Sequence, residues 1–325
     1  MFHRLRKPHI VLFFLSPFVV ELMTGSAPPL EFFSPVGFLF VVTWYGCGAL
    51  LIREIAFRKQ LNWKGILLLG MGFGILEEGI FVKTFFDPYA VDLDVFATFG
   101  RYFGTNIPWA VFLTLFHALY SILFPIMLTY VFFKEDIEKP WLTWRGMTTC
   151  SIVLAVFSLF GWFVSDPSLS GTPYIPSTAH FVGCLAVIAV LAGISFRTGK
   201  PEYTFERVTK KERRTLLLQG FIIGGLFSLG VFIVAALFTS TAISIGYILV
   251  IVGFIFFVKR RIKDNMPKFC YFIVASYFFW AFLGFLQEFN GVLGMSIVGI
   301  GFMVLFVKMV QYLNKQYLSS GSGTL

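Results

Sequence analysis

The feature that most constrains the fold is a succession of ten long apolar runs, most of which contain no charged residue. An apolar stretch of about 20 residues crosses a lipid bilayer, and about 17 to 25 are tolerated. In chain order the runs are Ile10–Met23, Phe33–Ile52, Gly65–Val82, Trp109–Phe133, Met147–Val164, His180–Phe196, Leu216–Phe238, Ala242–Val258, Phe269–Glu288 and Gly291–Leu313. Because backbone in lipid must satisfy its hydrogen bonds internally, each run predicts a helix. The predicted fold class is all-α, a polytopic transmembrane helical bundle of about ten helices.

The charged residues support the same class and orient the chain. Only 13% of residues are charged and 57% are hydrophobic, against about 25% and 45–50% in soluble domains. With ten helices in order, 24 of the 26 Lys and Arg residues fall on one side, and only Lys83 and Arg101 on the other. The positive-inside rule then predicts a multi-pass protein of the cell membrane with both termini in the cytoplasm. The net charge of +9 therefore implies no nucleic acid, and the predicted partner is the lipid bilayer.

No shift in composition marks a soluble domain, so residues 1–325 are predicted to form a single integral membrane domain. The first apolar run ends near small residues and resembles a cleavable secretory signal. Pro28 and Pro29 follow those small residues and disfavour cleavage, so we expect a retained helix.

Ionisable residues inside the predicted helices are the candidate functional groups, because they are costly in lipid and usually face the bundle interior. At about 1.5 Å of rise per residue, Glu77 and Glu78 lie roughly 20 Å from the cytoplasmic side, and His117 lies roughly 13 Å from the outer side. Four residues predicted to converge in the outer third of the bundle are Glu77, Glu78, His117 and His180. Three further polar residues expected at the rim of this site are Glu21, Glu288 and Asn290.

The third helix carries a pattern that would shield these carboxyl groups from lipid. Gly70, Gly74 and Glu78 are spaced by four and share one face. Small residues at this spacing let a neighbouring helix approach closely, so we expect a central third helix. A groove that serves helix packing alone would show the same spacing. Two adjacent carboxyl groups at membrane depth cannot both ionise cheaply, which favours a shared proton and a general base or proton carrier.

Two segments resemble the motifs of a known family. Gly74-Ile-Leu-Glu77-Glu78-Gly-Ile-Phe81-Val82-Lys83 resembles the first motif of the CAAX-protease and bacteriocin-processing (CPBP, or Abi) membrane peptidases, two glutamates followed four positions later by arginine. Leu113-Thr-Leu-Phe116-His117 is similar to the second motif, phenylalanine four residues before histidine. His180 opens the helix two further on, where the family has histidine four residues before asparagine. The resemblance covers about residues 60–190, and Val82, Leu113 and Cys184 stand where the family has arginine, phenylalanine and asparagine.

The resemblance implies an intramembrane endopeptidase-like hydrolase. Glu77 or Glu78 would activate a water, His117 would orient it or stabilise the oxyanion, and His180 would assist. The substrate would be a membrane-embedded peptide or small molecule, and this mechanism requires no cofactor. The same four residues could also ligate zinc or a similar ion, although no HExxH spacing is present.

Two other classes fit the same residues. Membrane-embedded glutamate and histidine could form the pathway of a proton-coupled transporter. In its favour, Gly284-Phe-Leu-Gln287-Glu288 echoes Gly74-Ile-Leu-Glu77-Glu78. A third class is a non-catalytic membrane scaffold, in which the polar cluster only packs the bundle. Assays for peptide cleavage and for proton-driven uptake separate these classes.

Overall fold

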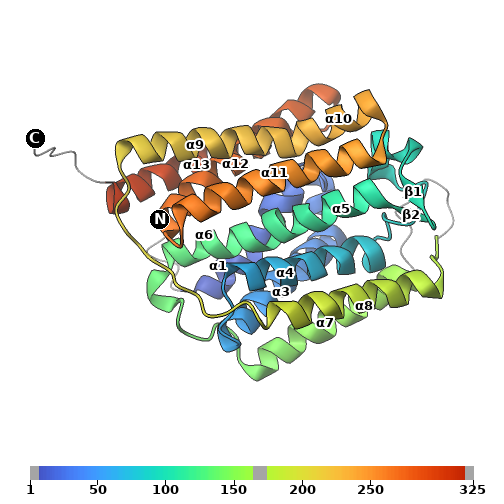
Figure 1. Cartoon of the computed structure of the whole chain (residues 1–325), viewed down its shortest axis with the longest axis horizontal. Coiled ribbons are helices and arrows are strands. Elements are labelled where there is room, and N and C mark those ends of the chain that lie inside the picture. The colour runs from blue at the N-terminus through green and yellow to red at the C-terminus, as the bar shows by residue number, and fades with distance from the viewer. Residues whose placement is uncertain (1–6, 164–173, 319–325) are drawn as a thin grey trace, which may run out of the picture.

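The computed structural model describes residues 7–163 and 174–318, and helices make up most of this part (Figure 1). The α-helices are α1 (Pro8–Pro17), α2 (Pro29–Phe32), α3 (Pro35–Arg58), α4 (Trp63–Ile75), α5 (Ile107–Phe116), α6 (Phe124–Phe132), α7 (Trp144–Phe163), α8 (Thr178–Ser195), α9 (Lys210–Gly225), α10 (Val231–Phe238), α11 (Thr241–Ile262), α12 (Met266–Gln287) and α13 (Met295–Tyr317). Segments of π-helix are η2 (Phe18–Leu22), η3 (Leu76–Phe81), η5 (His117–Leu123) and η7 (Leu226–Gly230). Short 3₁₀ helices are η4 (Val91–Thr98), η6 (Lys134–Asp136) and η8 (Glu288–Asn290).

Each predicted apolar run corresponds to a helix, although α3 begins at Pro35 rather than Phe33 and α13 at Met295 rather than Gly291. The predicted helical membrane bundle is confirmed. Within the described ranges, eight helices are long and apolar enough to cross a membrane. The other two predicted runs correspond to the shorter helix Pro8–Leu22 and to the continuous helix of α4 and η3, which carries Lys64, Glu77 and Glu78. Val164, the predicted end of the fifth helix, lies outside the described residues. The cytoplasmic location of both termini stays a prediction.

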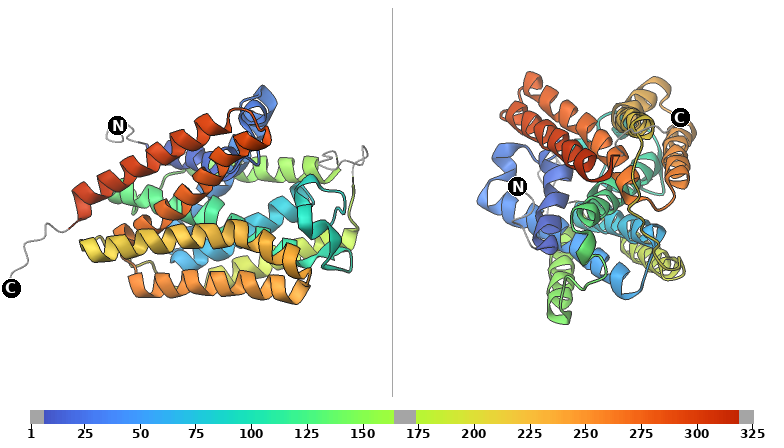
Figure 2. Two further views of the ribbon diagram at one scale, coloured as in Figure 1. Left: turned by 90° about the horizontal axis from the view of Figure 1, so that it is seen from above. Right: turned by 90° about the vertical axis from the view of Figure 1, so that its left-hand side faces the viewer.

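The helix that runs through α5, η5 and α6 forms the centre of the bundle. Its apolar span, Ile107–Phe132, is almost entirely buried by other helices, and the end-on view shows it surrounded by them (Figure 2). A helix that is apolar on all faces is expected in such a position. The third predicted helix, which was expected to be central, also lies inside the bundle. It packs against α3, α5, η5 and α8, and no residue from 65 to 82 is exposed.

A small cap covers one end of the bundle between η3 and α5. It contains η4 and a hairpin of strands β1 (Arg101–Tyr102) and β2 (Thr105–Asn106), which pair antiparallel. The side chain of Asn106 accepts a hydrogen bond from the Trp109 backbone N–H at 3.2 Å and so caps α5. This cap holds the loop that follows the paired glutamates against the start of the histidine-bearing helix.

The opposite end of the bundle contains a buried ion-pair cluster that the sequence did not predict. The second predicted helix ends at Ile52, whereas α3 continues to Arg58. Glu54 Oε2 lies 3.1 Å from Arg53 Nη1, and Glu54 Oε1 lies 2.9 Å from Arg58 Nε. The Trp141 backbone N–H donates to Glu54 Oε2 at 2.8 Å, and the Arg53 guanidinium stacks on the Trp141 ring. These contacts fasten the connection between α6 and α7 to the end of α3.

Candidate functional site

Three segments of π-helix present the ionisable residues of the membrane interior. Glu21 lies in η2, Glu77 and Glu78 lie in η3, and His117 is the first residue of η5. A π-helical turn inserts one extra residue into an α-helix, rotates the side chains that follow, and is frequently found at functional sites. All four of these ionisable side chains therefore come from π-helical turns.

Glycines bring the two central π-helical segments together. A methyl group added to Gly70 would lie 3.0 Å from the Ala118 Cα, and one added to Gly74 would lie 3.1 Å from the His117 Cβ. Such close helix approach is possible only with small residues at the interface. The prediction that Gly70, Gly74 and Glu78 face other helices is confirmed, because Glu78 is also buried.

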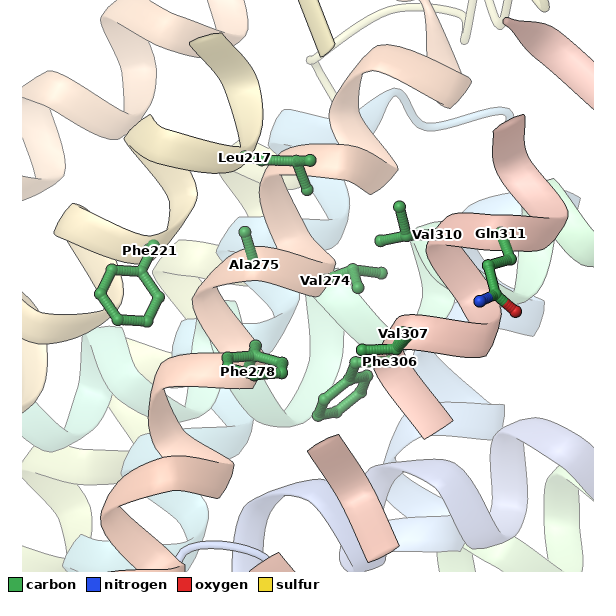
Figure 3. A pocket seen from close by; sticks show the side chains of 9 residues that line it. All are labelled: Leu217, Phe221, Val274, Ala275, Phe278, Phe306, Val307, Val310 and Gln311. Atoms are coloured by element: carbon green, nitrogen blue, oxygen red, sulfur yellow. The ribbon is translucent and has the colours of Figure 1, made fainter. Parts of the chain in front are cut away.

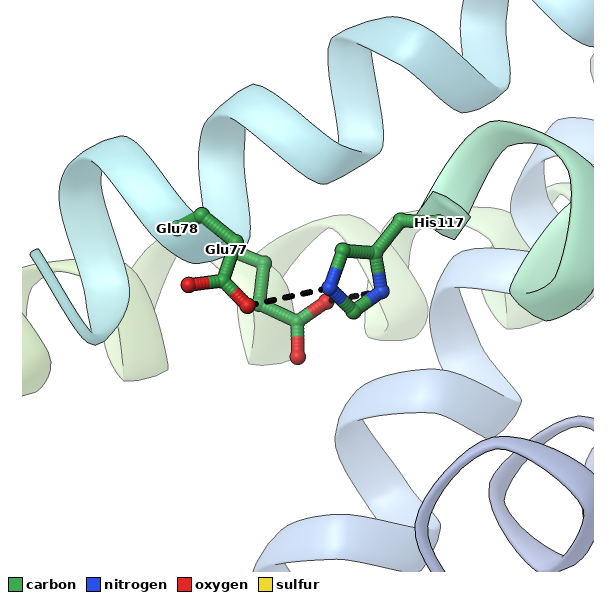
Figure 4. Close-up of side chains that lie close together, drawn as sticks. All are labelled: Glu77, Glu78 and His117. Atoms are coloured by element: carbon green, nitrogen blue, oxygen red, sulfur yellow. Dashed lines mark hydrogen bonds and ion pairs between the residues drawn. The ribbon is translucent and has the colours of Figure 1, made fainter. Parts of the chain in front are cut away.

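The two glutamates flank the imidazole of His117 (Figure 4). Nε2 of His117 lies 3.0 Å from Glu78 Oε1. Nδ1 lies 2.9 Å from the Ser121 hydroxyl and 3.1 Å from Glu77 Oε2. Of the two contacts of Nδ1, only the one with Ser121 has hydrogen-bond geometry, and Glu77 Oε2 lies beside the ring without a hydrogen-bond partner. Glu77, Glu78 and His117 are each less than a tenth exposed, which excludes most competing water.

Tyr45 of α3 extends the cluster to the first helix. Its hydroxyl is hydrogen-bonded to both Glu21 Oε1 and Glu77 Oε1. A phenol carries one proton, so it donates fully to only one of these oxygens; protonation of the other carboxyl group would let that group donate to the phenolic oxygen. Tyr45 therefore links the Glu21 and Glu77 carboxyl groups through a single hydroxyl.

The other end of the cluster is held by the cap. The Thr84 hydroxyl donates to Glu78 Oε2, and the Trp109 indole N–H donates to the Thr84 hydroxyl at 3.1 Å. This pair fixes the Glu78 carboxyl in the orientation in which its other oxygen faces His117. Tyr45, Thr84 and Trp109 were not predicted as site residues.

His180 lies outside this cluster, and its predicted convergence with the glutamates was wrong. Its Nε2 is 2.9 Å from the Phe103 carbonyl oxygen, and its Nδ1 is 2.9 Å from the Ser177 hydroxyl. Its ring packs on Phe86, with the ring centroids 4.4 Å apart. Both nitrogens are engaged because His180 begins α8 at the end of the bundle, beside the hairpin.

Of the three residues predicted at the rim of the site, one joins the cluster and two lie outside it. Glu21 joins the cluster through Tyr45. Glu288 instead accepts a hydrogen bond from the Ser296 backbone N–H at 2.9 Å and caps the start of α13, and Asn290 is exposed in η8. These two residues terminate α12, so they lie beyond the depth of the buried carboxyl groups.

The cluster offers ligands for a metal ion. In the part of the chain that the structure describes, one group of three His, Cys, Asp or Glu residues has ligand atoms within 4.8 Å of one another, and it consists of Glu77, Glu78 and His117. The hydrogen bond between Nδ1 and Ser121 leaves Nε2 toward Glu78, as in histidine ligands held by a partner on the second nitrogen. One imidazole and two carboxylates suit zinc or a similar ion. Of the four predicted metal ligands, the structure brings Glu77, Glu78 and His117 together and leaves His180 outside.

A cavity of about 520 Å³ lies beside these helices. Its wall includes Ile75, three residues before Glu78, and Thr114, three residues before His117. His180 and Cys184 of α8 also line this cavity, and its other lining residues are mostly apolar. A chain with extended apolar groups fits such a cavity next to the cluster.

A second cavity, of about 270 Å³, has a different character. Figure 3 shows its lining from α9, α12 and α13: Leu217, Phe221, Val274, Ala275, Phe278, Phe306, Val307, Val310 and Gln311. No ionisable side chain is among these residues, so this cavity offers apolar contact alone.

The close helix approach predicts a large effect of a bulky residue at position 74. We expect Gly74→Leu to lower the free energy of unfolding by about 1–3 kcal/mol, because overpacking forces α4 away from η5. Unfolding of the purified protein in mixed micelles, followed by circular dichroism, measures this change. Gly193→Leu on α8 is the matched control, since nothing lies within 4 Å of a methyl group there. Equal stability of the two variants would contradict the packing account.

Comparison with curated proteins and with solved structures finds no match to either. A comparison with family models finds one that covers most of the chain, from the first predicted helix to the last. Residues 10–311 match the model described as "Uncharacterized membrane protein family", and the chain therefore belongs to this family of membrane proteins.

Proposed function

We propose that this protein is a membrane-embedded hydrolase in which Glu78 and His117 activate a water, with a membrane-embedded peptide as substrate. The observation that carries the proposal is the buried pair of Glu78 Oε1 and His117 Nε2, 3.0 Å apart, with a second carboxylate beside the ring. An acid and an imidazole at hydrogen-bond distance are the parts that general acid–base catalysis needs. The similarity of these two helices to the first two CPBP motifs supports the same assignment.

The proposed reaction uses water as its only co-reactant. The Glu78 carboxylate takes a proton from a water bound to both groups, and the resulting hydroxide forms a bond to the peptide carbonyl carbon. His117 donates a hydrogen bond to the carbonyl oxygen as negative charge develops there. The carbon–nitrogen bond then breaks, and the proton held by Glu78 passes to the leaving amine.

Neighbouring groups support these two roles. Glu77 Oε2, 3.1 Å from Nδ1, stabilises a positively charged His117. The Thr84 hydroxyl holds the Glu78 carboxyl in place. The apolar cavity beside Ile75 and Thr114 provides a position for the substrate segment. A metal at Glu77, Glu78 and His117 would supply the same activation of water by lowering its pKa.

The test is cleavage of transmembrane peptides by the purified protein in liposomes. We expect new peptide termini, detected by mass spectrometry, with one ¹⁸O atom incorporated per new carboxyl group in H₂¹⁸O. Absence of cleavage across a broad library of apolar peptides, with the protein folded, would contradict the proposal.

A second candidate, proton transfer, rests on a separate observation. Glu21, Tyr45, Glu77 and His117 form a continuous line of polar contacts across four helices. Such a line carries protons when one member is protonated and the next is an acceptor. If this is the function, liposomes will show proton-driven flux that Tyr45→Phe abolishes, with no covalent product.

A further inference from the structure

A third cavity, distinct from the polar cluster, lies between α9, α11 and the start of α12. It measures about 260 Å³ and is lined by Lys211, Glu212, Thr215, Leu216, Gln219, Val258, Arg261, Ile262 and Lys268. The beginning of α9 and the end of α11 lie at the same end of the bundle (Figure 1). This is the end at which the predicted basic loops gather.

The charges in this cavity are not balanced. Lys268 Nζ lies 2.6 Å from Glu212 Oε1, so these two residues neutralise each other. Glu212 Oε2 accepts from the Thr209 backbone N–H at 2.9 Å as part of the capping box of α9, so it is held in place. Lys211 and Arg261 are exposed. The Arg261 guanidinium lies over the Phe257 ring, 5.7 Å from its centroid, and among the described residues neither cation forms a hydrogen bond or an ion pair. The cavity therefore has two cations available for an anionic ligand.

The wall below the cations is apolar. Leu216 and Val258 lie farther from this end of the bundle than Lys211 and Arg261 and are buried side chains of this wall, and Ile262 is buried beside Arg261. On the outer surfaces of the same helices, Leu218 and Phe257 are exposed, as expected for helices in contact with lipid. A ligand that fills this cavity thus meets positive charge at one end and hydrocarbon at the other.

We propose that this cavity binds the phosphate headgroup of an anionic phospholipid, with Lys211 and Arg261 as the phosphate ligands. Basic cavities between transmembrane helices are typical binding sites for such headgroups. Arginine offers a planar pair of donors to a phosphate, and lysine adds a point charge. The first carbons of the lipid chains lie along Leu216 and Val258. Inorganic phosphate shares the headgroup chemistry but has no apolar part to match this wall.

The experiment is lipid titration of the full chain in a neutral detergent, followed by native mass spectrometry. The probes are phosphatidylglycerol, phosphatidylcholine and inorganic phosphate. We expect one phosphatidylglycerol to bind at least tenfold more tightly than phosphatidylcholine, and millimolar phosphate to displace it poorly. Equal binding of the two lipids would overturn the proposal, as would displacement by phosphate at the concentration of the lipid.

Variants locate the site. The double variant Lys211→Gln/Arg261→Gln should weaken phosphatidylglycerol binding about 30-fold, because each basic residue near a lipid phosphate contributes several-fold. Lys211→Arg/Arg261→Lys keeps both charges and should retain binding. Arg197→Gln/Lys200→Gln removes two exposed charges outside the cavity and is the matched control. An equal loss of affinity in the control would show diffuse attraction and overturn the assigned site.

Discussion

Glu78→Gln is expected to slow peptide hydrolysis about a thousandfold while leaving the fold unchanged. Glutamine has the same shape and still accepts a hydrogen bond from Thr84, but it cannot take a proton from water. Loss of a general base typically costs about 10²- to 10⁴-fold in rate. Cleavage of a transmembrane peptide in liposomes by equal amounts of folded protein measures the effect.

The matched control for this change is Glu288→Gln. It makes the same substitution at an acid that caps α13 and lies outside the buried cluster. We expect its hydrolysis rate to stay within about twofold of the unmodified protein, since Glu288 has no part in the proposed chemistry. A Glu78→Gln variant as fast as this control would exclude Glu78 as the base.

Glu54→Ala is expected to cause a large loss of stability at the other end of the bundle. The change leaves the Arg53 guanidinium fully buried without its carboxylate. It also leaves the Trp141 backbone N–H without its acceptor. Removal of one partner of a buried ion pair typically costs about 3–5 kcal/mol. Unfolding in mixed micelles measures the change in free energy.

Asp136→Asn provides the comparison for this loss. Asp136 lies 2.8 Å from Lys139 in an ion pair that is largely exposed to solvent. Exposed pairs contribute about 0–1 kcal/mol, so Asp136→Asn should change stability little. A loss below about 1 kcal/mol for Glu54→Ala would contradict the role assigned to the buried cluster.

The helices could be predicted because apolar length alone determines them. Backbone groups in lipid must pair within a helix, so an apolar run such as Trp109–Phe133 leaves little choice of structure. The end of α3 could not be predicted in this way. Arg53 and Arg58 suggest a solvated loop, and they remain in a helix because Glu54 and a distant loop satisfy their charge.

The candidate site was predicted in part. The sequence predicts that Glu77, Glu78 and His117 meet, because the spacing of Gly70 and Gly74 and the depth of the ionisable residues both indicate one helix contact. Depth along the membrane does not define position around the bundle, so His180 was assigned to a site that it does not reach. Tyr45 could not be predicted as a site residue, because a tyrosine in an apolar helix is usually a packing residue. Only the fold places it between Glu21 and Glu77.

The central claim is that Glu78 and His117 act on one water as a unit. The most direct test is a double-mutant cycle on the hydrolysis rate, with Glu78→Gln, His117→Ala and both changes together. Groups that act as a unit are strongly non-additive, so we expect the double variant to be about as slow as either single variant. Losses that multiply, to about a millionfold in the double variant, would show independent roles and contradict the claim.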